Sequence, residues 1–126
     1  MLARRSLLMT LAAAAAVLAG CASAPPLPHG VSLIDAEWLK TRIQVKEPMI
    51  SRSDTGTLRV FVPVRNLVEG RIVIEGRATF RGSAGSEAPS GWKRVFINKD
   101  SSETLEFLSL SDRAGDYLVE LREGNR

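Results

Sequence analysis

The sequence has 126 residues, with 17 Lys and Arg, 14 Asp and Glu and one histidine, which gives a net charge of +3 at pH 7. Its single cysteine excludes an intramolecular disulfide, so the fold must depend on an apolar core. One histidine and one cysteine also exclude the usual zinc ligand sets, and we expect no metal and no other cofactor.

The first twenty residues are typical of an export signal. Arg4 and Arg5 precede an uncharged apolar run of twelve residues, Leu7 to Leu18. This run is too short to span a bilayer, which needs about 20 apolar residues, but it fits the apolar region of a secretory signal. We predict that residues 1–20 are a signal peptide.

The apolar run ends in Leu18-Ala19-Gly20-Cys21, which resembles the lipobox of bacterial lipoprotein precursors. The resemblance implies that Cys21 receives a diacylglyceryl group, that cleavage occurs between Gly20 and Cys21, and that the new amine is acylated, with palmitate as the expected acid. Two or three acyl chains anchor a domain firmly, whereas one chain binds a membrane only marginally. The alternative is an inert, buried cysteine in an uncleaved segment.

Ala22 follows this cysteine. In enteric lipoproteins an aspartate at that position holds the protein in the inner membrane, so the resemblance implies the periplasmic side of the outer membrane. Loss of Arg4 and Arg5 with the signal lowers the net charge to +1, from 15 Lys and Arg against 14 Asp and Glu. Neither location nor charge then favours nucleic acid as a partner.

Residues 21–30 read as a lipid anchor followed by a linker. Pro25, Pro26 and Pro28 lie among small residues, a composition typical of a short extended spacer. Residues 31–126 are enough for one domain. Because no further change of composition follows, we predict a single folded unit there.

Most of that domain alternates apolar and polar residues with a period of two, which predicts strands. The expected strands are 39–46, 58–65, 71–81, 92–97, 104–108 and 117–122, and only 33–39 could form a helical turn. Turn residues separate them at 53–56, 69–70, 82–91, 98–101 and 111–115. The pattern predicts an all-β fold, a small immunoglobulin-like β-sandwich of six or seven strands.

Three residues carry specific expectations within this fold. Pro63 cannot donate a backbone hydrogen bond, so its strand should be an edge strand or carry a bulge. Gly76 leaves space inside a strand, which Trp38 or Trp92 could fill. Tyr117 follows a tight turn and should hydrogen-bond back to that turn, as in the corner of many sandwich domains.

A wider resemblance covers most of the domain. A strand runs into Asn66, an aromatic-ended strand continues into the turn Phe80-Arg81-Gly82-Ser83-Ala84-Gly85, Trp92 opens the next strand, and Ser109, Ala114, Asp116 and Tyr117 precede the last. This order is similar to that of the YcfL-like periplasmic lipoproteins, a family of unknown function with a small β-sandwich domain. Thr79 stands where that family often has a second aromatic. The resemblance implies an envelope lipoprotein without known catalysis, and it identifies no functional residues.

Catalytic patterns are scarce in this sequence. His29 lies in the linker, where nothing would hold it against a serine, so a Ser-His-acid arrangement has no scaffold. The carboxylates fall on solvent-side strand positions and in turns, and no phosphate-binding loop opens a helix. We predict that the protein is not an enzyme.

The sequence offers a surface as its candidate site: Arg59, Phe61, Arg65, Arg71, Arg77 and Arg81. If the strands that carry these residues pair as a hairpin, they form one arginine band around Phe61, with Phe61 opposite Arg77 in one register. If the strands belong to opposite sheets, as in many immunoglobulin-like domains, the band is split. A solvated face of mixed charge is the structural alternative.

These features predict a membrane-anchored, non-enzymatic interaction or accessory module for an envelope protein assembly. One alternative is a module that binds peptidoglycan or an anionic glycan through the arginines, because guanidinium groups pair well with carboxylate and phosphate. A second alternative is a small lipoprotein subunit of a secretion system, such as type VI.

Overall fold

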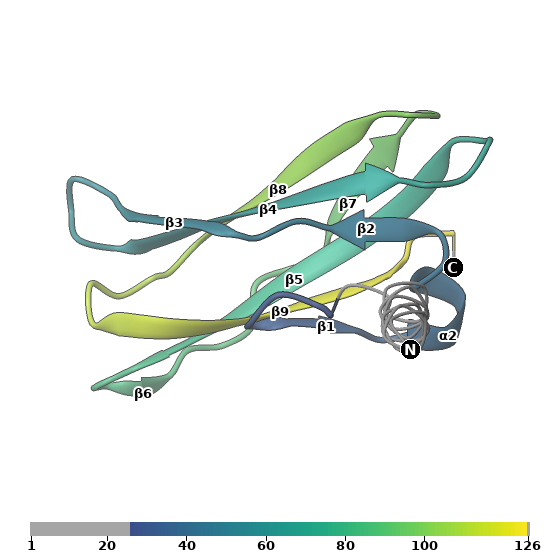
Figure 1. The fold of residues 1–126 in the computed structure, drawn as a ribbon. Coiled ribbons are helices and arrows are strands. Elements are labelled where there is room, and N and C mark those ends of the chain that lie inside the picture. The colour runs from purple at the N-terminus through teal and green to yellow at the C-terminus, as the bar shows by residue number, and fades with distance from the viewer. Residues whose placement is uncertain (1–25, 126) are drawn as a thin grey trace, which may run out of the picture.

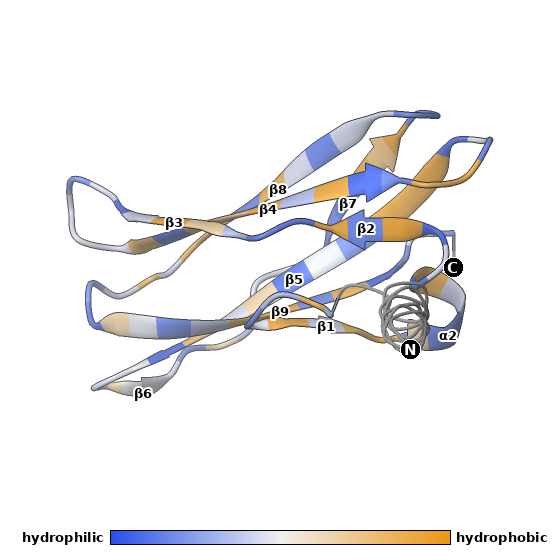
Figure 2. Cartoon of the chain, in the orientation of Figure 1, coloured by the Kyte–Doolittle hydropathy of each residue, from blue (hydrophilic) through white to orange (hydrophobic). Residues whose placement is uncertain are grey.

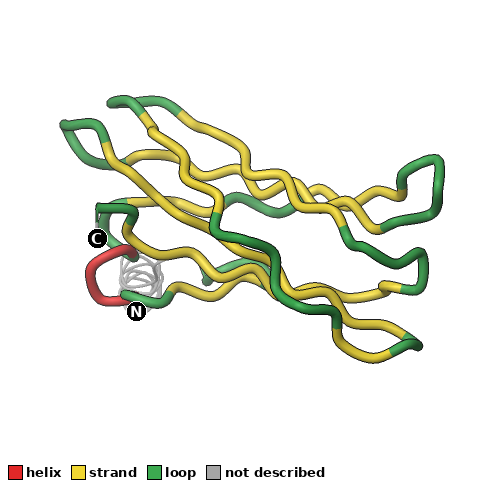
Figure 3. Tube along the Cα trace, turned by 180° about the vertical axis from the view of Figure 1, so that it is seen from behind, coloured by secondary structure: helices red, strands yellow, loops and turns green. Residues whose placement is uncertain are grey.

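The protein is a sandwich of two β-sheets, seen edge-on in Figure 1. This computed structural model describes residues 26–125. Nine strands and one short helix make up the described part of the chain, and strands dominate the trace in Figure 3. The predicted all-β sandwich is confirmed, with nine strands in place of six or seven.

One sheet, sheet A, has β5 (Ile72–Gly82) and β9 (Ala114–Glu123) as its long antiparallel strands. The short strand β1 (Val31–Leu33) lies parallel to β9 at one edge. At the other side, β6 (Gly85–Ser86) and β7 (Lys93–Ile97) both pair with β5. The C-terminal strand therefore lies inside the sheet, next to the strand that follows the linker.

The other sheet, sheet B, is centred on β4 (Leu58–Asn66). The strand β8 (Ser102–Leu108) pairs with β4 on one side. On the other side, β2 (Ile43–Val45) and β3 (Met49–Arg52) follow one another along β4, so together they form an interrupted edge. Sheet A and sheet B meet through the side chains that alternate inward along β4, β5, β8 and β9.

The core lies between the sheets and is made of aliphatic and aromatic side chains. Figure 2 shows the apolar residues recurring along β4 and β5. The largest fully buried apolar side chains are those of Phe107, Leu39, Ile74, Ile97, Leu121, Val60, Val62, Val64 and Val119. The period-two pattern that predicted the strands is therefore the pattern of burial.

The helical turn expected in 33–39 is present as α2 (Ala36–Leu39). The Asp35 carbonyl accepts hydrogen bonds from the amides of Trp38 and Leu39, and the helix buries Leu39 completely. The strand expected over 39–46 is therefore shorter, since only β2 within it is extended. The guanidinium of Arg42 lies 4.3 Å from the Trp38 ring centre, a cation–π contact between α2 and the segment that leads into β2. No helix among residues 26–125 is long and apolar enough to cross a membrane.

The expectation for Pro63 was wrong, because its strand β4 is central in sheet B. The Lys46 amide donates to the Pro63 carbonyl at 2.9 Å, which places the backbone of Pro63 on the side of β2 and β3. Pro63 thus faces the interruption between these two edge strands. The absence of an N–H group on Pro63 is tolerated there, because no edge strand presents a carbonyl that would need this hydrogen bond.

Gly76 does leave space, but neither tryptophan fills it. A Cβ on Gly76 would lie 3.0 Å from Leu121 Cδ2, 3.2 Å from Leu105 Cδ1 and 3.3 Å from Phe107 Cζ. Leu105 and Phe107 belong to β8 in the opposite sheet. The absence of a side chain at Gly76 lets the two sheets approach over β5.

Candidate functional site

The six predicted surface residues fall on opposite sheets. Arg59, Phe61 and Arg65 lie on β4 in sheet B, whereas Arg77 and Arg81 lie on β5 in sheet A, with Arg71 just before it. Since β4 and β5 do not pair, the hairpin interpretation was wrong, and the two strands belong to opposite sheets, as the alternative arrangement predicted. No single arginine band forms, and Phe61 does not face Arg77.

On the outer face of sheet A, arginines pair with carboxylates across β5 and β9. Arg77 Nε lies 2.9 Å from Glu120 Oε1, and Arg81 Nη2 lies 3.0 Å from Asp116 Oδ2. The register places each of these residues directly opposite its partner. Opposite charges at such positions stabilise strand pairing.

The centre of this face is Glu75, whose side chain is only 11% exposed. Its carboxylate has two cationic partners, Arg94 from β7 at 3.3 Å and Arg122 from β9 at 3.0 Å. Burial of a carboxylate is costly unless it is paired. Glu75 therefore links three strands by charge.

Trp92 covers part of this network. The guanidinium carbons of Arg122 and Arg77 lie 3.7 and 4.6 Å from its ring centre. Arg71 lies 5.1 Å from the ring centre of Phe96 in the same way. The arginines of sheet A are thus engaged within the domain, which the sequence did not reveal because Trp92 and Arg122 are 30 residues apart in the chain.

A recess of about 320 Å³ lies on sheet A where the end of the linker meets it. His29, Gly30, Thr79, Arg81, Asp116, Tyr117 and Leu118 line it. The amide of Tyr117 donates to Asp116, and this bond, with Arg81, lowers the pKa of the Asp116 carboxyl below its usual 3.8. His29 Nε2 lies 3.9 Å from the same carboxylate.

Tyr117 has a structural role, as expected, but a different partner. Its hydroxyl donates to the carbonyl of His29 at 3.2 Å rather than to its own turn. Gly30, at φ +80°, brings the chain against the ring, where a Cβ would lie 2.6 Å from Tyr117 Cε2. The amide of Val119 also donates to the Gly30 carbonyl. The end of the linker is therefore held on the domain, although the His29 side chain is 86% exposed.

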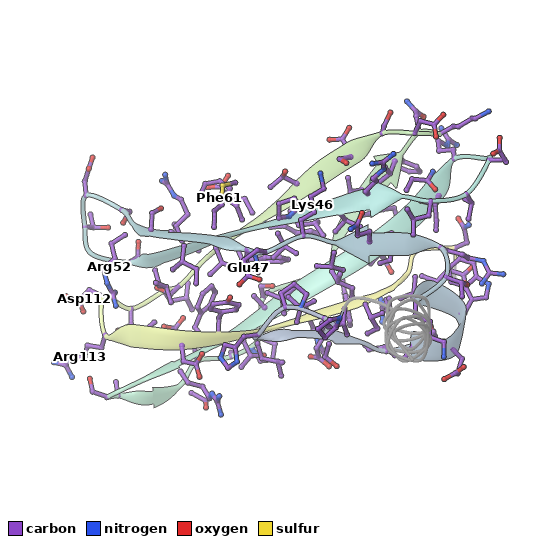
Figure 4. All side chains as sticks on the ribbon, viewed as in Figure 1. Lys46, Glu47, Arg52, Phe61, Asp112 and Arg113 are labelled. Atoms are coloured by element: carbon purple, nitrogen blue, oxygen red, sulfur yellow. The ribbon has the colours of Figure 1, made fainter. Side chains whose placement is uncertain are left out.

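Apolar side chains are also exposed on the outer face of sheet B. Met49 and Leu108 are 59% and 49% exposed. Met49 lies directly opposite the half-buried Phe61, and Leu108 lies opposite Arg59 on the same face. Figure 4 shows Phe61 above sheet B, on the side away from sheet A. We call these three residues, Met49, Phe61 and Leu108, the apolar patch. Of these residues, only Phe61 could be identified from the sequence, because exposure depends on which strands have no neighbouring element packed over them.

Two arginines lie on the same face of sheet B as the apolar patch. Arg59 lies 5.9 Å from the Phe61 ring centre, and its Nε is 3.4 Å from Glu106 Oε1 but makes no hydrogen bond within residues 26–125. Arg65 is exposed, and no ion pair involves it in that part of the chain. The patch therefore combines apolar surface with cationic side chains.

Gly20 and Cys21, the predicted cleavage and lipidation site, lie outside the described residues. The predicted signal peptide and residues 22–25 of the linker lie there too. Within residues 26–125, no group of three or more His, Cys, Asp or Glu side chains is placed to hold a metal ion.

Comparisons with known proteins bear on the fold. No family model matches this sequence, and no curated protein matches it. The crystal structure of Campylobacter jejuni cj0090 is similar, with 16% identity over 75% of this chain and 97% of that chain and a TM-score of 0.57. A DUF1425 family member from Shewanella sp. pv-4 is also similar, with 16% identity over 67% of this chain and 80% of that chain and a TM-score of 0.55. At this identity the likeness shows that the sandwich fold is shared with these two bacterial proteins.

Proposed function

We propose that this chain is a bacterial envelope lipoprotein, held by lipid on Cys21 at the periplasmic side of the outer membrane. There it acts as a non-enzymatic accessory module that binds a protein of an envelope assembly. The sequence supports the anchor through the lipobox-like run that ends at Cys21. The observation that carries the binding role is the apolar patch on sheet B.

The apolar patch suits a protein partner better than a glycan. Exposed apolar clusters bordered by polar residues mark protein interaction sites, and Met and Phe are enriched at the centres of interfaces. A glycan-binding role would use free guanidinium groups. However, Arg77 and Arg81 are paired with carboxylates, and Arg71 lies on an aromatic ring.

A short tether would keep this module close to the membrane. Pro28 is the seventh residue after Cys21, and the Pro28 carbonyl already accepts a hydrogen bond from the amide of Val31. Seven residues reach at most about 25 Å. A partner would therefore be a membrane protein or a protein that lies against the membrane.

The test is crosslinking in intact cells, followed by affinity capture and mass spectrometry. The variants are Met49→Ser with Leu108→Ser, which removes much of the apolar patch, and Cys21→Ser, which removes the anchor. Leu67→Ser is the matched control, because Leu67 is 50% exposed in the β4–β5 turn.

We expect one dominant protein that is captured by the wild type and by Leu67→Ser but lost from the other two variants. Capture of cell-wall fragments without a protein would overturn the proposal in favour of the glycan-binding alternative. A partner from a secretion machine would assign the module to that assembly.

A further inference from the structure

The edge strand β3 carries a second feature, which does not depend on the proposed function. All four residues of β3 are exposed, and β4 is its only partner strand in the described part of the chain. Such an edge presents backbone donors and acceptors to which another strand can pair.

The register shows which backbone groups of β3 are free. Ser53 donates to the Thr57 carbonyl, so Ser53 is hydrogen-bonded to the strand that leads into β4. Antiparallel residues alternate between hydrogen-bonded and non-hydrogen-bonded pairs. Ser51, two residues earlier, therefore points its backbone groups towards β4, whereas Ile50 and Arg52 point theirs outward, away from the sheet.

The side chain of Arg52 does not block this edge. Its guanidinium donates to the carbonyls of Gly56 at 2.9 Å, Asp112 at 3.4 Å and Ala114 at 2.8 Å. These bonds turn the side chain toward the end of the sandwich, where Figure 4 shows it near Asp112. Ile50, 53% exposed, remains as an apolar side chain at the edge.

We propose that two copies of this chain pair antiparallel through β3, with the twofold axis at Ser51. This register places Ile50 of each copy opposite Arg52 of the other, so that all four outward N–H groups find an outward carbonyl. Ser51 then lies opposite its own copy in a non-hydrogen-bonded pair, where Cα atoms are about 4.5 Å apart. Sheet B becomes continuous across the two molecules.

Charge along the edge fits this pairing. Ser51 lies opposite Arg59 on β4. The Lys46 amide donates to the carbonyl of Pro63, which is four residues further along the same strand. Asp54 follows Ser51 by three residues. The twofold axis therefore brings Lys46 of each copy within side-chain reach of Asp54 of the other. Neither charge is in an ion pair among residues 26–125, so both are available.

The pairing is weak because β3 is short. A strand pair of four residues buries far less than the roughly 1,200 Å² of a standard interface. The second copy is therefore best detected by a covalent trap.

The experiment introduces one cysteine, Ser51→Cys, into the full chain carrying Cys21→Ser, so that no other thiol is present. A Cα separation of about 4.5 Å allows a disulfide. Ser32→Cys is the matched control, since Ser32 is exposed on β1, the edge strand of sheet A. The purified chains are oxidised mildly in detergent and separated on a non-reducing gel.

We expect Ser51→Cys to run mainly as a disulfide-linked dimer and Ser32→Cys as a monomer. Adding Asp54→Lys to Ser51→Cys should reduce the dimer about fivefold by repulsion, and adding Lys46→Asp as well should restore it. Equal dimer from both cysteine variants, or a monomer from Ser51→Cys, would overturn the pairing. Because Cys21 is absent throughout, none of these outcomes depends on the lipid anchor.

Discussion

Asn66 offers the sharpest test of how the loops at one end of the sandwich are held. It ends β4 and is only 1% exposed. Its Nδ2 donates to the carbonyls of Gly70 at 2.8 Å and Ile97 at 2.9 Å, and its Oδ1 accepts from the amide of Val68 at 2.8 Å. One side chain thus joins the β4–β5 turn to the end of β7.

Asn66→Ala removes all of these hydrogen bonds at once. A buried backbone group left without a partner costs about 1–3 kcal/mol. The buried Ile97 carbonyl would lose its hydrogen bond to Asn66 without access to water, whereas the Gly70 carbonyl and the Val68 amide could bond to water instead. We expect a loss of about 2–4 kcal/mol in the free energy of unfolding, which lowers the melting temperature by roughly 10 °C or more for a domain of this size.

Urea unfolding followed by tryptophan fluorescence measures this loss. The matched control is Asn98→Ala, because Asn98 is exposed and takes part in the network only through its backbone carbonyl. We expect the control to stay within about 0.5 kcal/mol of the wild type. An Asn66→Ala chain as stable as this control would refute the reasoning.

Three further outcomes follow from the structure. Burial raises the pKa of Tyr117 above its usual 10, so the free energy of unfolding should fall as the pH rises past about 10. Because Tyr117 is the only tyrosine, phenolate absorbance measures its titration directly. An unshifted pKa would contradict this prediction. Glu75→Gln should lower the free energy of unfolding, measured in urea, by about 1–3 kcal/mol, because it leaves Arg94 and Arg122 around a neutral amide. An unchanged unfolding midpoint would contradict the charge link between the strands. Gly76→Val should lower the unfolding free energy by at least about 1–3 kcal/mol, since its side chain would collide with Leu105, Phe107 and Leu121, and a stable variant would show that the sheets can separate there.

Much of the fold could be predicted because it is local. The alternation in 58–65 and 71–81 marks β4 and β5, and the turn residues at 53–56 mark the hairpin between β3 and β4. The strands β1, β3 and β6 were missed because they contain two to four residues, too few to show a period. Their extended form is imposed by the long strands beside them.

The candidate site could not be predicted in the same way, because it depends on which strands pair. The sequence identifies Arg59 and Arg77 as solvent-facing, and both are on outer faces. It does not reveal that Arg77 meets Glu120, 43 residues later, while Arg59 lies in the other sheet. Nor does it reveal that Met49 lies opposite Phe61 and that Leu108 lies opposite Arg59 on the same face. These contacts come from topology, which the period of a pattern does not encode.

One measurement tests the proposed lipid on Cys21 directly. The protein is expressed in a bacterial host supplied with labelled palmitate, beside a Cys21→Ser chain, and the mass of its N-terminal peptide is measured by mass spectrometry. We expect a peptide that begins at Cys21 and carries the diacylglyceryl and acyl masses, with label in the wild type alone. A wild-type chain that retains residues 1–20, or begins at Cys21 without added mass, would contradict it.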